Sequence, residues 1–280
     1  MIKFLVIGDG CTDVHIYGKC NRLSPEAPVP ILNPIKTIKN GGMAKNVKSN
    51  LIKMGAEVQI ITNPNNIKKI RYVDAHTNAM LLRVDENDFT ERVSSDVISK
   101  IQKNIYEDFY FDGLIISDYC KGFLTETDIQ FLIEHNDNVF LDTKKILGEW
   151  MYDVNFVKIN EKEYEKTKRY VDDKKLNDKV EPSEEIKEKI TKAVEEGDSE
   201  EIIKLNDKLI ITRGSDGCQY QDNIYSVPQV DGVKDYSGAG DTFLSGFAYQ
   251  YMNTKNVKSA INYAQECATI VVQKHGVATI

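Results

Sequence analysis

Residues 235–246 read DYSGAGDTFLSG, a glycine-rich turn that runs directly into apolar residues at helical spacing. That spacing predicts a helix that begins at the turn and directs its first amides toward whatever binds there. The amides of Gly238, Ala239 and Gly240 could converge on an anion, whose charge the helix dipole would favour. Asp241 would stand beside that anion, where a carboxylate can accept a proton from a hydroxyl group. On the residues alone, an aspartate that only caps the helix is an equally good interpretation.

Short apolar runs alternate with helix-like stretches over the rest of the chain. The runs that predict buried strands are 3–8, 58–62, 113–117, 139–142, 155–159 and 208–212. Because the runs are unbroken, both faces of each strand should be covered, as in a parallel sheet between helices. Helical spacing predicts helices over 43–54, 91–109 and 125–136, with Gly55 ending the first. The alternation predicts an α/β fold, a doubly wound and mainly parallel sheet with helices on both faces.

Two stretches break this alternation and predict a small β-lid over one edge of the sheet. Residues 21–37 hold four of the seven prolines, which favours an edge strand or a loop. Residues 69–86 alternate like an exposed hairpin. We expect residues 1–280 to form a single domain in which about 14–40 and 68–88 make the lid. The charge-rich stretch 161–207 predicts a solvated helical surface without a binding site.

Two further glycine segments supply candidate groups for a polar ligand. GGMAKN at 41–46 opens a predicted helix, so Gly42 leaves the backbone accessible and Asn46 can both donate and accept hydrogen bonds. GDGCTD at 8–13 follows the first strand, and Asp13 at the end of a strand suits a hydroxyl group as acceptor. This segment lacks the third glycine and the following helix of a dinucleotide fingerprint, which argues against that function. Each segment could also be only a turn.

Composition and missing motifs exclude several classes of function. A net charge of −7 and a pI near 5.3 argue against a nucleic-acid partner. No long apolar run or secretion signal is present, so we expect no membrane partner. The five cysteines form no CxxC pair, which favours a reducing, cytoplasmic compartment. Neither GxxxxGK[ST], HRD, DFG nor HExxH occurs, which excludes P-loop, protein-kinase and zinc-protease chemistry. A small molecule is the expected partner.

Taken together, these segments resemble the ribokinase-like, PfkB-type carbohydrate kinases over nearly the whole chain. GGMAKN resembles the first signature of that family and DYSGAGDTFLSG the second. Between them, NEKE at 160–163 resembles the N-x-x-E motif, and TRGSDG at 212–217 resembles the nucleotide-binding turn. The resemblance implies a ribokinase-like fold and a kinase that uses ATP and Mg²⁺.

The same resemblance implies roles for individual residues. Asp241 would be the general base, and the amides of Gly238, Ala239 and Gly240 would offset charge on the transferred phosphoryl group. The sugar would lie between Asp13, Gly42, Asn46 and the lid. The residues implied on the nucleotide and metal side are Asn160, Glu163, Thr212, Gly214 and Gly217, with Glu163 acting on Mg²⁺. Asp235 and Ser237 would contribute to a monovalent-cation site, with K⁺ as its ion.

A closer likeness is to the kinase half of bacterial heptose-7-phosphate kinase/adenylyltransferase enzymes, carried by RLSPEAPVP (22–30), LLRVDE (81–86) and SDYCKG (117–122). It implies phosphorylation of D-glycero-D-manno-heptose 7-phosphate at the anomeric hydroxyl. Because an isolated β-appendage with exposed edges is only marginally stable, and because the family resemblance implies pairing through such lids, we expect a homodimer joined through the lid. A phosphorylated sugar needs basic residues around its pocket. The main candidates are Arg83 and Lys121. Further candidates are Arg22, Arg71 and Lys144.

Some residues depart from the family pattern. Met43 and Lys45 replace small residues in the first signature, and DTKK at 142–145 lacks the usual Pro-Lys-Gly. These departures bear on the substrate rather than on the kinase chemistry. The alternatives are another sugar or a nucleoside as substrate, or a non-catalytic sugar- or nucleotide-binding protein on the same fold.

Overall fold

The computed structural model of the chain describes residues 1–177, 204–228, 230, 232–274 and 276–280. Its centre is an eight-stranded sheet in the order β14-β13-β12-β11-β10-β9-β1-β4. The strands are β1 (Lys3–Gly8), β4 (Glu57–Thr62), β9 (Gly113–Asp118), β10 (Val139–Thr143), β11 (Phe156–Asn160), β12 (Leu209–Thr212), β13 (Cys218–Tyr220) and β14 (Asn223–Tyr225). The pairs from β4 to β12 are parallel, and β13 and β14 pair antiparallel. Each of the six predicted apolar runs forms one of these strands.

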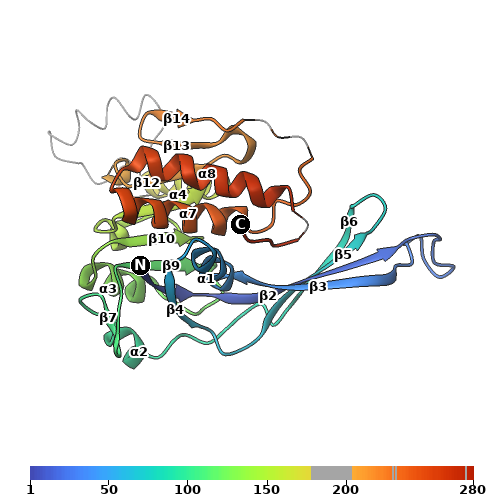
Figure 1. Ribbon diagram of the computed structural model, residues 1–280, viewed down its shortest axis with the longest axis horizontal. Coiled ribbons are helices and arrows are strands. Elements are labelled where there is room, and N and C mark those ends of the chain that lie inside the picture. The colour runs from blue at the N-terminus through green and yellow to red at the C-terminus, as the bar shows by residue number, and fades with distance from the viewer. Residues whose placement is uncertain (178–203, 229, 231, 275) are drawn as a thin grey trace.

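Helices cover both faces of the central sheet (Figure 1). One face carries α1 (Ala44–Lys53), α7 (Ala239–Thr254) and α8 (Val257–Val272), and the other carries α2 (Ser95–Ser99), α3 (Glu126–His135) and α4 (Glu161–Asn177). Alternate residues of one strand enter different cores: Phe4 and Val6 pack with α1, α7 and α8, whereas Leu5 and Ile7 pack with α2, α3 and α4. This arrangement confirms the predicted fold class, and it explains why the strands are apolar throughout.

A second sheet of four strands projects from one end of the central sheet (Figure 1). Its strands are β2 (Gly10–Lys19), β3 (Asn33–Met43), β5 (Ile67–Asp74) and β6 (Met80–Glu86), in the order β3-β2-β5-β6. We call this sheet the lid sheet. Strand β3 contains Pro34 and lies at an edge, the position in a sheet that tolerates proline. Because β2 starts two residues after β1, Asp13 lies inside a strand of the lid sheet and not at the end of β1 as expected.

The predicted helix over 91–109 is wrong. The structure has the short helix α2 there, followed by the small hairpin of β7 (Ile105–Tyr106) and β8 (Phe109–Tyr110). Lys103, Asn104 and Glu107 have φ angles of 53°, 60° and 52°, which a right-handed helix excludes. Asn104 is held in this bend by its backbone amide, which donates to Asn136 Oδ1 over 3.0 Å.

The charge-rich stretch 161–207 is described only in part. Helix α4 accounts for its beginning, where most side chains over 161–170 are exposed. Residues 178–203 of that prediction lie outside the described residues. The short helices η1 (Glu149–Met151) and η2 (Gly214–Asp216) complete the elements. Within the part of the chain that the structure describes, every helix falls short of the length and apolarity needed to cross a membrane.

Candidate active site

The glycine turn at 238–240 forms the N-terminus of α7, as its spacing predicts. Gly238 precedes the helix with a φ of 84°, a left-handed conformation that glycine adopts without strain. A Cβ atom at this position would lie 2.7 Å from Asn46 Nδ2, so a side chain would collide with α1. Glycine therefore lets α7 begin close against α1, and the Ala239 amide donates to the Tyr236 carbonyl just before the helix over 3.3 Å.

Asp241 lies in the first turn of α7 and is only 3% exposed. Its Oδ1 accepts a hydrogen bond of 2.6 Å from the Tyr119 hydroxyl, and its Oδ2 accepts one of 3.1 Å from Asn46 Nδ2. Burial raises the pKa of Asp241 to about 6, although both hydrogen bonds lower it. A carboxyl group with a pKa near neutrality is suited to accept a proton at physiological pH.

Of the three residues expected to bind the sugar, Asn46 contacts Asp241, and Gly42 and Asp13 lie against each other. Asn46 donates directly to Asp241, and its position on α1 is fixed by a 3.2 Å hydrogen bond from Asn50 Nδ2 to its Oδ1. Gly42 faces Asp13 across the lid sheet, because a Cβ at Gly42 would lie 1.9 Å from Asp13 Oδ2. Asp13 is buried and forms an ion pair with Arg71.

The loop after β9 contributes Tyr119, which the sequence analysis did not single out. Asp9 Oδ2 accepts hydrogen bonds from the backbone amides of Tyr119, at 2.7 Å, and Lys121, at 3.2 Å, and so fixes this loop. Two ammonium groups lie over the Tyr119 ring: Lys69 Nζ and Lys144 Nζ are each 5.1 Å from its centroid. A ring held this way directs its hydroxyl at Asp241.

Several of the basic residues predicted to contact a phosphate form ion pairs with acidic side chains, and one lies far from the site. Arg83 donates to both carboxylate oxygens of Asp85 over 2.7 Å, and Lys121 Nζ lies 2.5 Å from Asp88 Oδ2. Lys144 pairs with Glu163. Arg22 lies in the loop joining β2 to β3, at the far end of the lid sheet, some nine strand residues or about 30 Å from Gly10. The structure therefore does not bring Arg22 to the site within one chain.

A buried ion pair lies beside the glycine turn. Lys158 Nζ on β11 is 2.7 Å from Asp142 Oδ2 on β10, and both side chains are almost fully buried. A Cβ at Gly240 would lie 3.0 Å from Lys158 Nζ, so this ammonium group stands against the amides of the turn. The sequence analysis missed Lys158. The signal was a lysine within the apolar run 155–159, where a charge is costly unless it is paired or used.

The NEKE segment forms a reciprocal cap at the start of α4. The amide and side chain of Asn160 donate to Glu163 Oε2 and Oε1 over 2.8 and 2.7 Å, and the Glu163 amide donates to Asn160 Oδ1 over 3.0 Å. With Lys144 also on Oε1, both carboxylate oxygens are engaged. No cluster of three acidic, histidine or cysteine side chains in the described ranges could hold a metal. Because both Glu163 oxygens are engaged, this residue fits a contact to Mg²⁺ through water, since that ion keeps several of its waters.

The TRGSDG turn joins β12 to β13. Gly217 has a φ of 89°, and a Cβ there would lie 2.0 Å from the Tyr225 carbonyl oxygen, so packing requires this glycine. A Cβ at Gly214 would meet no atom within 4 Å, so its backbone faces open space that a ligand can approach. Thr212 ends β12 and donates its hydroxyl to the Ile159 carbonyl over 3.2 Å. These features fit a nucleotide that lies against the turn.

Asp235 and Ser237 adjoin the same glycine turn. The Ser237 amide donates to Asp235 Oδ1 over 2.8 Å, and His15 Nε2 lies 3.3 Å from Asp235 Oδ2. Burial alone would raise the pKa of Asp235, but the close contact with His15 and the hydrogen bond from Ser237 outweigh it and lower the pKa to about 2. A permanently ionised carboxylate fits a monovalent cation.

Residues 42–280 match the model of the pfkB family of carbohydrate kinases. The chain belongs to this family. It is therefore a carbohydrate kinase, a phosphotransferase with an alcohol group as acceptor, and the resemblance stated from the signatures is confirmed. ATP and Mg²⁺ are the cosubstrate and metal that this family implies.

Curated relatives of this kinase are named bifunctional protein HldE. The protein from a Nitratiruptor species is 29% identical over 309 residues, which cover 99% of this chain and 63% of the relative. The protein from Haemophilus influenzae is 28% identical over 314 residues, covering 99% of this chain and 61% of the relative. The chain thus spans less than two thirds of the length of these relatives.

Solved kinase structures share the fold at low sequence identity. The nucleoside kinase of Methanocaldococcus jannaschii has a TM-score of 0.62 and 17% identity, covering 99% of this chain and 93% of its own. Arabidopsis thaliana ribokinase, complexed with ribose and ATP, has a TM-score of 0.61 and 14% identity, with coverages of 99% and 94%. Escherichia coli phosphofructokinase-2, complexed with fructose-6-phosphate, has a TM-score of 0.62 and 13% identity, with coverages of 97% and 94%.

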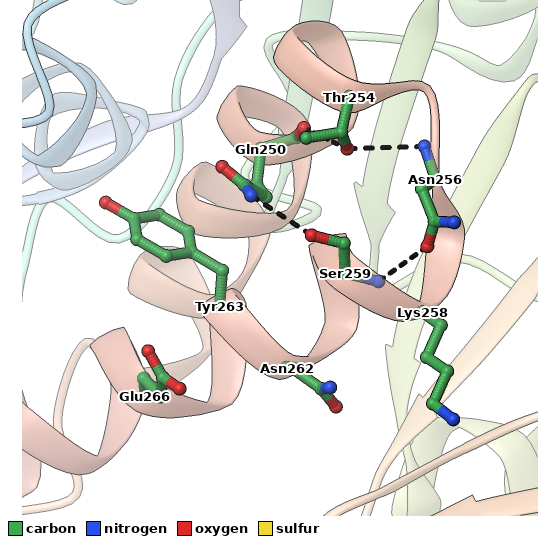
Figure 2. A pocket seen from close by; sticks show the side chains of 8 residues that line it. All are labelled: Gln250, Thr254, Asn256, Lys258, Ser259, Asn262, Tyr263 and Glu266. Carbon is green, nitrogen blue, oxygen red and sulfur yellow. Dashed lines mark hydrogen bonds between the residues drawn. The ribbon is translucent and has the colours of Figure 1, made fainter.

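A polar hollow on the kinase surface lies away from these residues. Figure 2 shows this cavity of about 600 Å³ between the end of α7 and the start of α8. Its lining consists of Gln250, Thr254, Asn256, Lys258, Ser259, Asn262, Tyr263 and Glu266. None of these is a candidate site residue, and the hydrogen bonds drawn across the hollow, such as Gln250 to Ser259, tie the two helices together.

Proposed function

We propose that this kinase transfers the γ-phosphoryl group of ATP to D-glycero-D-manno-heptose 7-phosphate, at the anomeric hydroxyl, with Asp241 as general base. The observation that carries the proposal is the buried Asp241, with a pKa of about 6, in the first turn of α7 beside its N-terminal amides. Resemblance of three segments to heptose-7-phosphate kinases supports the choice of sugar, and so does the similarity to the HldE proteins.

Asp241 accepts the proton of the acceptor hydroxyl while that oxygen attacks the γ-phosphorus. The hydrogen bonds from Tyr119 and Asn46 hold the carboxylate in one orientation, so no reorganisation is needed as the proton moves. The amides of Gly238, Ala239 and Gly240 donate to the oxygens of the transferring group. The Lys158 ammonium group, paired with Asp142, is packed against Gly240 behind the turn. Asp13, Gly42 and Asn46 bind and orient the sugar.

The nucleotide would lie along Thr212, Gly214 and Gly217, with Asn160 and Glu163 at its phosphates. Mg²⁺, when bound, neutralises phosphate charge, and Glu163 would act on it through water. Asp235 and Ser237 would contribute to a K⁺ site that supports the glycine turn. Crystals of Escherichia coli phosphofructokinase-2 in complex with potassium give precedent for such an ion in a protein of this fold.

The exposed edge strands of the lid sheet favour a homodimer. Ile35 and Leu82, on the edge strands β3 and β6, are 59% and 56% exposed, and exposed apolar side chains on a projecting sheet favour a second copy as cover. In this proposal residues 1–280 form a single domain, and about 14–40 and 68–88 form a lid that closes over the sugar and excludes water. Cysteines 11, 20, 120, 218 and 267 are all free, which supports a cytoplasmic enzyme.

A panel of acceptors tests the proposed substrate. ADP formation is measured with heptose 7-phosphate, fructose 6-phosphate, neutral heptose, fructose, ribose and a nucleoside, each at two salt concentrations. We expect heptose 7-phosphate to give the highest kcat/KM, and its advantage over neutral heptose to shrink at high salt, because exposed charges are screened. Better use of any neutral sugar or nucleoside would overturn the substrate assignment and leave the carbohydrate kinase.

A further inference from the structure

Lys69 is a buried cation on the inner face of the lid sheet. It is 9% exposed, and its Nζ lies 5.1 Å from the Tyr119 ring centroid. Among the described residues, no hydrogen bond or ion pair reaches this ammonium group. The adjacent Lys68 points to the opposite face of β5 and forms a 2.8 Å ion pair with Glu86. The two lysines thus differ in burial and in partners although they are neighbours in the chain.

The carboxylates around Lys69 already form ion pairs with other basic side chains. Asp13 on β2 pairs with Arg71, Asp85 on β6 pairs with Arg83, and Asp88 pairs with Lys121. Burial lowers the pKa of Lys69; Cys11 and Asp13 raise it, and Arg83 and Lys121 lower it further. A buried ammonium group without its own counter-ion is costly to the fold, and an anionic ligand would offset that cost.

The position of Lys69 relative to Asp241 points to the acceptor rather than to ATP. Tyr119 bridges the two groups, with its ring face on Lys69 and its hydroxyl on Asp241 Oδ1. The ammonium group is therefore separated from the proposed base by about the length of a tyrosine side chain. It also lies on the lid sheet beside Asp13, on the side where the sugar is expected.

We propose that Lys69 is the residue that binds the anionic group of the acceptor, a phosphate ester at the end of the sugar remote from the reacting hydroxyl. This inference rests on the proposed function and adds the residue that selects a phosphorylated substrate. Arg83 and Lys121 lie at the exposed border of the same cluster and steer the anion toward Lys69. Asp13 remains the group that accepts from the sugar hydroxyls.

The test compares Lys69→Met with the matched control Lys68→Met. Both remove one ammonium group from the same strand, so a general effect of charge on the protein affects both. For Lys69→Met we expect the KM for heptose 7-phosphate to rise at least about 10-fold, with the KM for ATP unchanged, because a charge-assisted bond to the phosphate is lost. Lys68→Met should match the wild type. An unchanged KM for the sugar phosphate in Lys69→Met overturns the inference.

A binding experiment makes the result independent of turnover. Heptose 7-phosphate and inorganic phosphate are titrated calorimetrically, without ATP, into the wild type, Lys69→Met, Lys69→Gln and Lys68→Met, each checked for a native melting transition. Loss of sugar-phosphate binding in whichever Lys69 variants fold, with binding kept in Lys68→Met, supports the inference. Equal binding in the wild type and the Lys69 variants overturns it. When binding is equal, the acceptor panel shows how far the failure reaches. If the wild type still uses sugar phosphates best, only the role of Lys69 is wrong. If the wild type uses neutral sugars best, the proposed substrate is wrong as well.

Discussion

Asp241 is deeply buried, which disfavours its charged form, yet its proposed role requires it to ionise. Tyr119 is central to this balance, because its hydrogen bond to Oδ1 lowers a pKa that burial raises. Removing the hydroxyl should leave the carboxylate less stable in its ionised form. The base would then titrate at a higher pH.

Tyr119→Phe is expected to move the acidic limb of the pH profile of kcat/KM to higher pH. The proposed base works only when ionised, so activity rises with pH through the pKa of Asp241, and a raised pKa shifts that rise upward. The measurement is kcat/KM for the sugar between pH 5 and 8.5, with Tyr110→Phe, an exposed tyrosine on β8, as control. A lower kcat with an unmoved acidic limb would mean that Tyr119 only fills space.

The raised pKa of Asp241 also predicts a stability effect. Its folded-state pKa of about 6 lies above the ordinary value of 3.8, so the folded protein loses stability as pH rises from about 4 to 6 and does not regain it above 6. The shift corresponds to about 3 kcal/mol. Asp241→Asn should therefore melt at a higher temperature than the wild type at pH 7.5, with the gap closing toward pH 4.5. Equal gaps at the two pH values would show that burial of the charge is not the cause.

At the scale of single residues, site residues that belong to motifs could be predicted from the sequence. Residues whose burial depends on the register of strand pairing could not. Asp241 and Asn46 follow glycine segments, so their spacing was informative. Lys69 is buried because β5 pairs with β2 in a register that sets it opposite Asp13 on the buried face. A one-residue slip would have exposed it and buried Lys68 instead. No local pattern in the sequence encodes that pairing.

At the scale of elements, the start of α4 combines a structural and a proposed functional role. Glu163 caps the helix through Asn160 and pairs with Lys144, yet it is also the residue that would act on Mg²⁺. Glutamine in its place keeps one of the two oxygens that accept from Asn160, but it lacks the charge that pairs with Lys144 and that would act on Mg²⁺. One substitution therefore removes the proposed metal role and keeps part of the cap.

Glu163→Gln should raise the Mg²⁺ concentration for half-maximal activity several-fold while changing the melting temperature little. Activity is titrated with Mg²⁺ at saturating ATP and sugar. Glu161→Gln, in the same first turn but exposed, is the control. If the Mg²⁺ titration of Glu163→Gln coincides with the wild type, the residue is a cap and nothing more.

Elements buried on both faces were predictable, whereas elements shaped by turns were not. The six apolar runs became strands because only a covered sheet accommodates such sequences. The stretch 91–109 has helical spacing, but left-handed residues at 103, 104 and 107 turn it into a bend and a hairpin. Strand β2 was missed at its start because GDGCTD resembles a turn, and its pairing with β3 and β5 makes it a strand.

At the scale of the whole molecule, the lid sheet extends away from the body (Figure 1). It carries exposed apolar residues, among them Ile35 and Leu82. If a second copy covers these residues, the enzyme should scatter light as a particle of twice 31.8 kDa at micromolar concentration. Leu82→Asp, which puts a charge on the exposed edge strand β6, should shift the population to monomer. Ile52→Asp, at a half-exposed position on α1, should not. A wild type that scatters only as a 31.8 kDa particle would rule out the proposed dimer.

The proposed chemistry of the whole enzyme depends most on Asp241 as the group that takes the proton of the acceptor. The direct measurement is kcat for ADP formation from ATP and heptose 7-phosphate by the wild type and Asp241→Asn, with ATP affinity measured separately by calorimetry. We expect kcat to fall at least about 100-fold while ATP affinity stays within a factor of about two, because the base is lost and the amides of the turn remain. Turnover by Asp241→Asn within a few-fold of the wild type would contradict the assignment of Asp241 as the base.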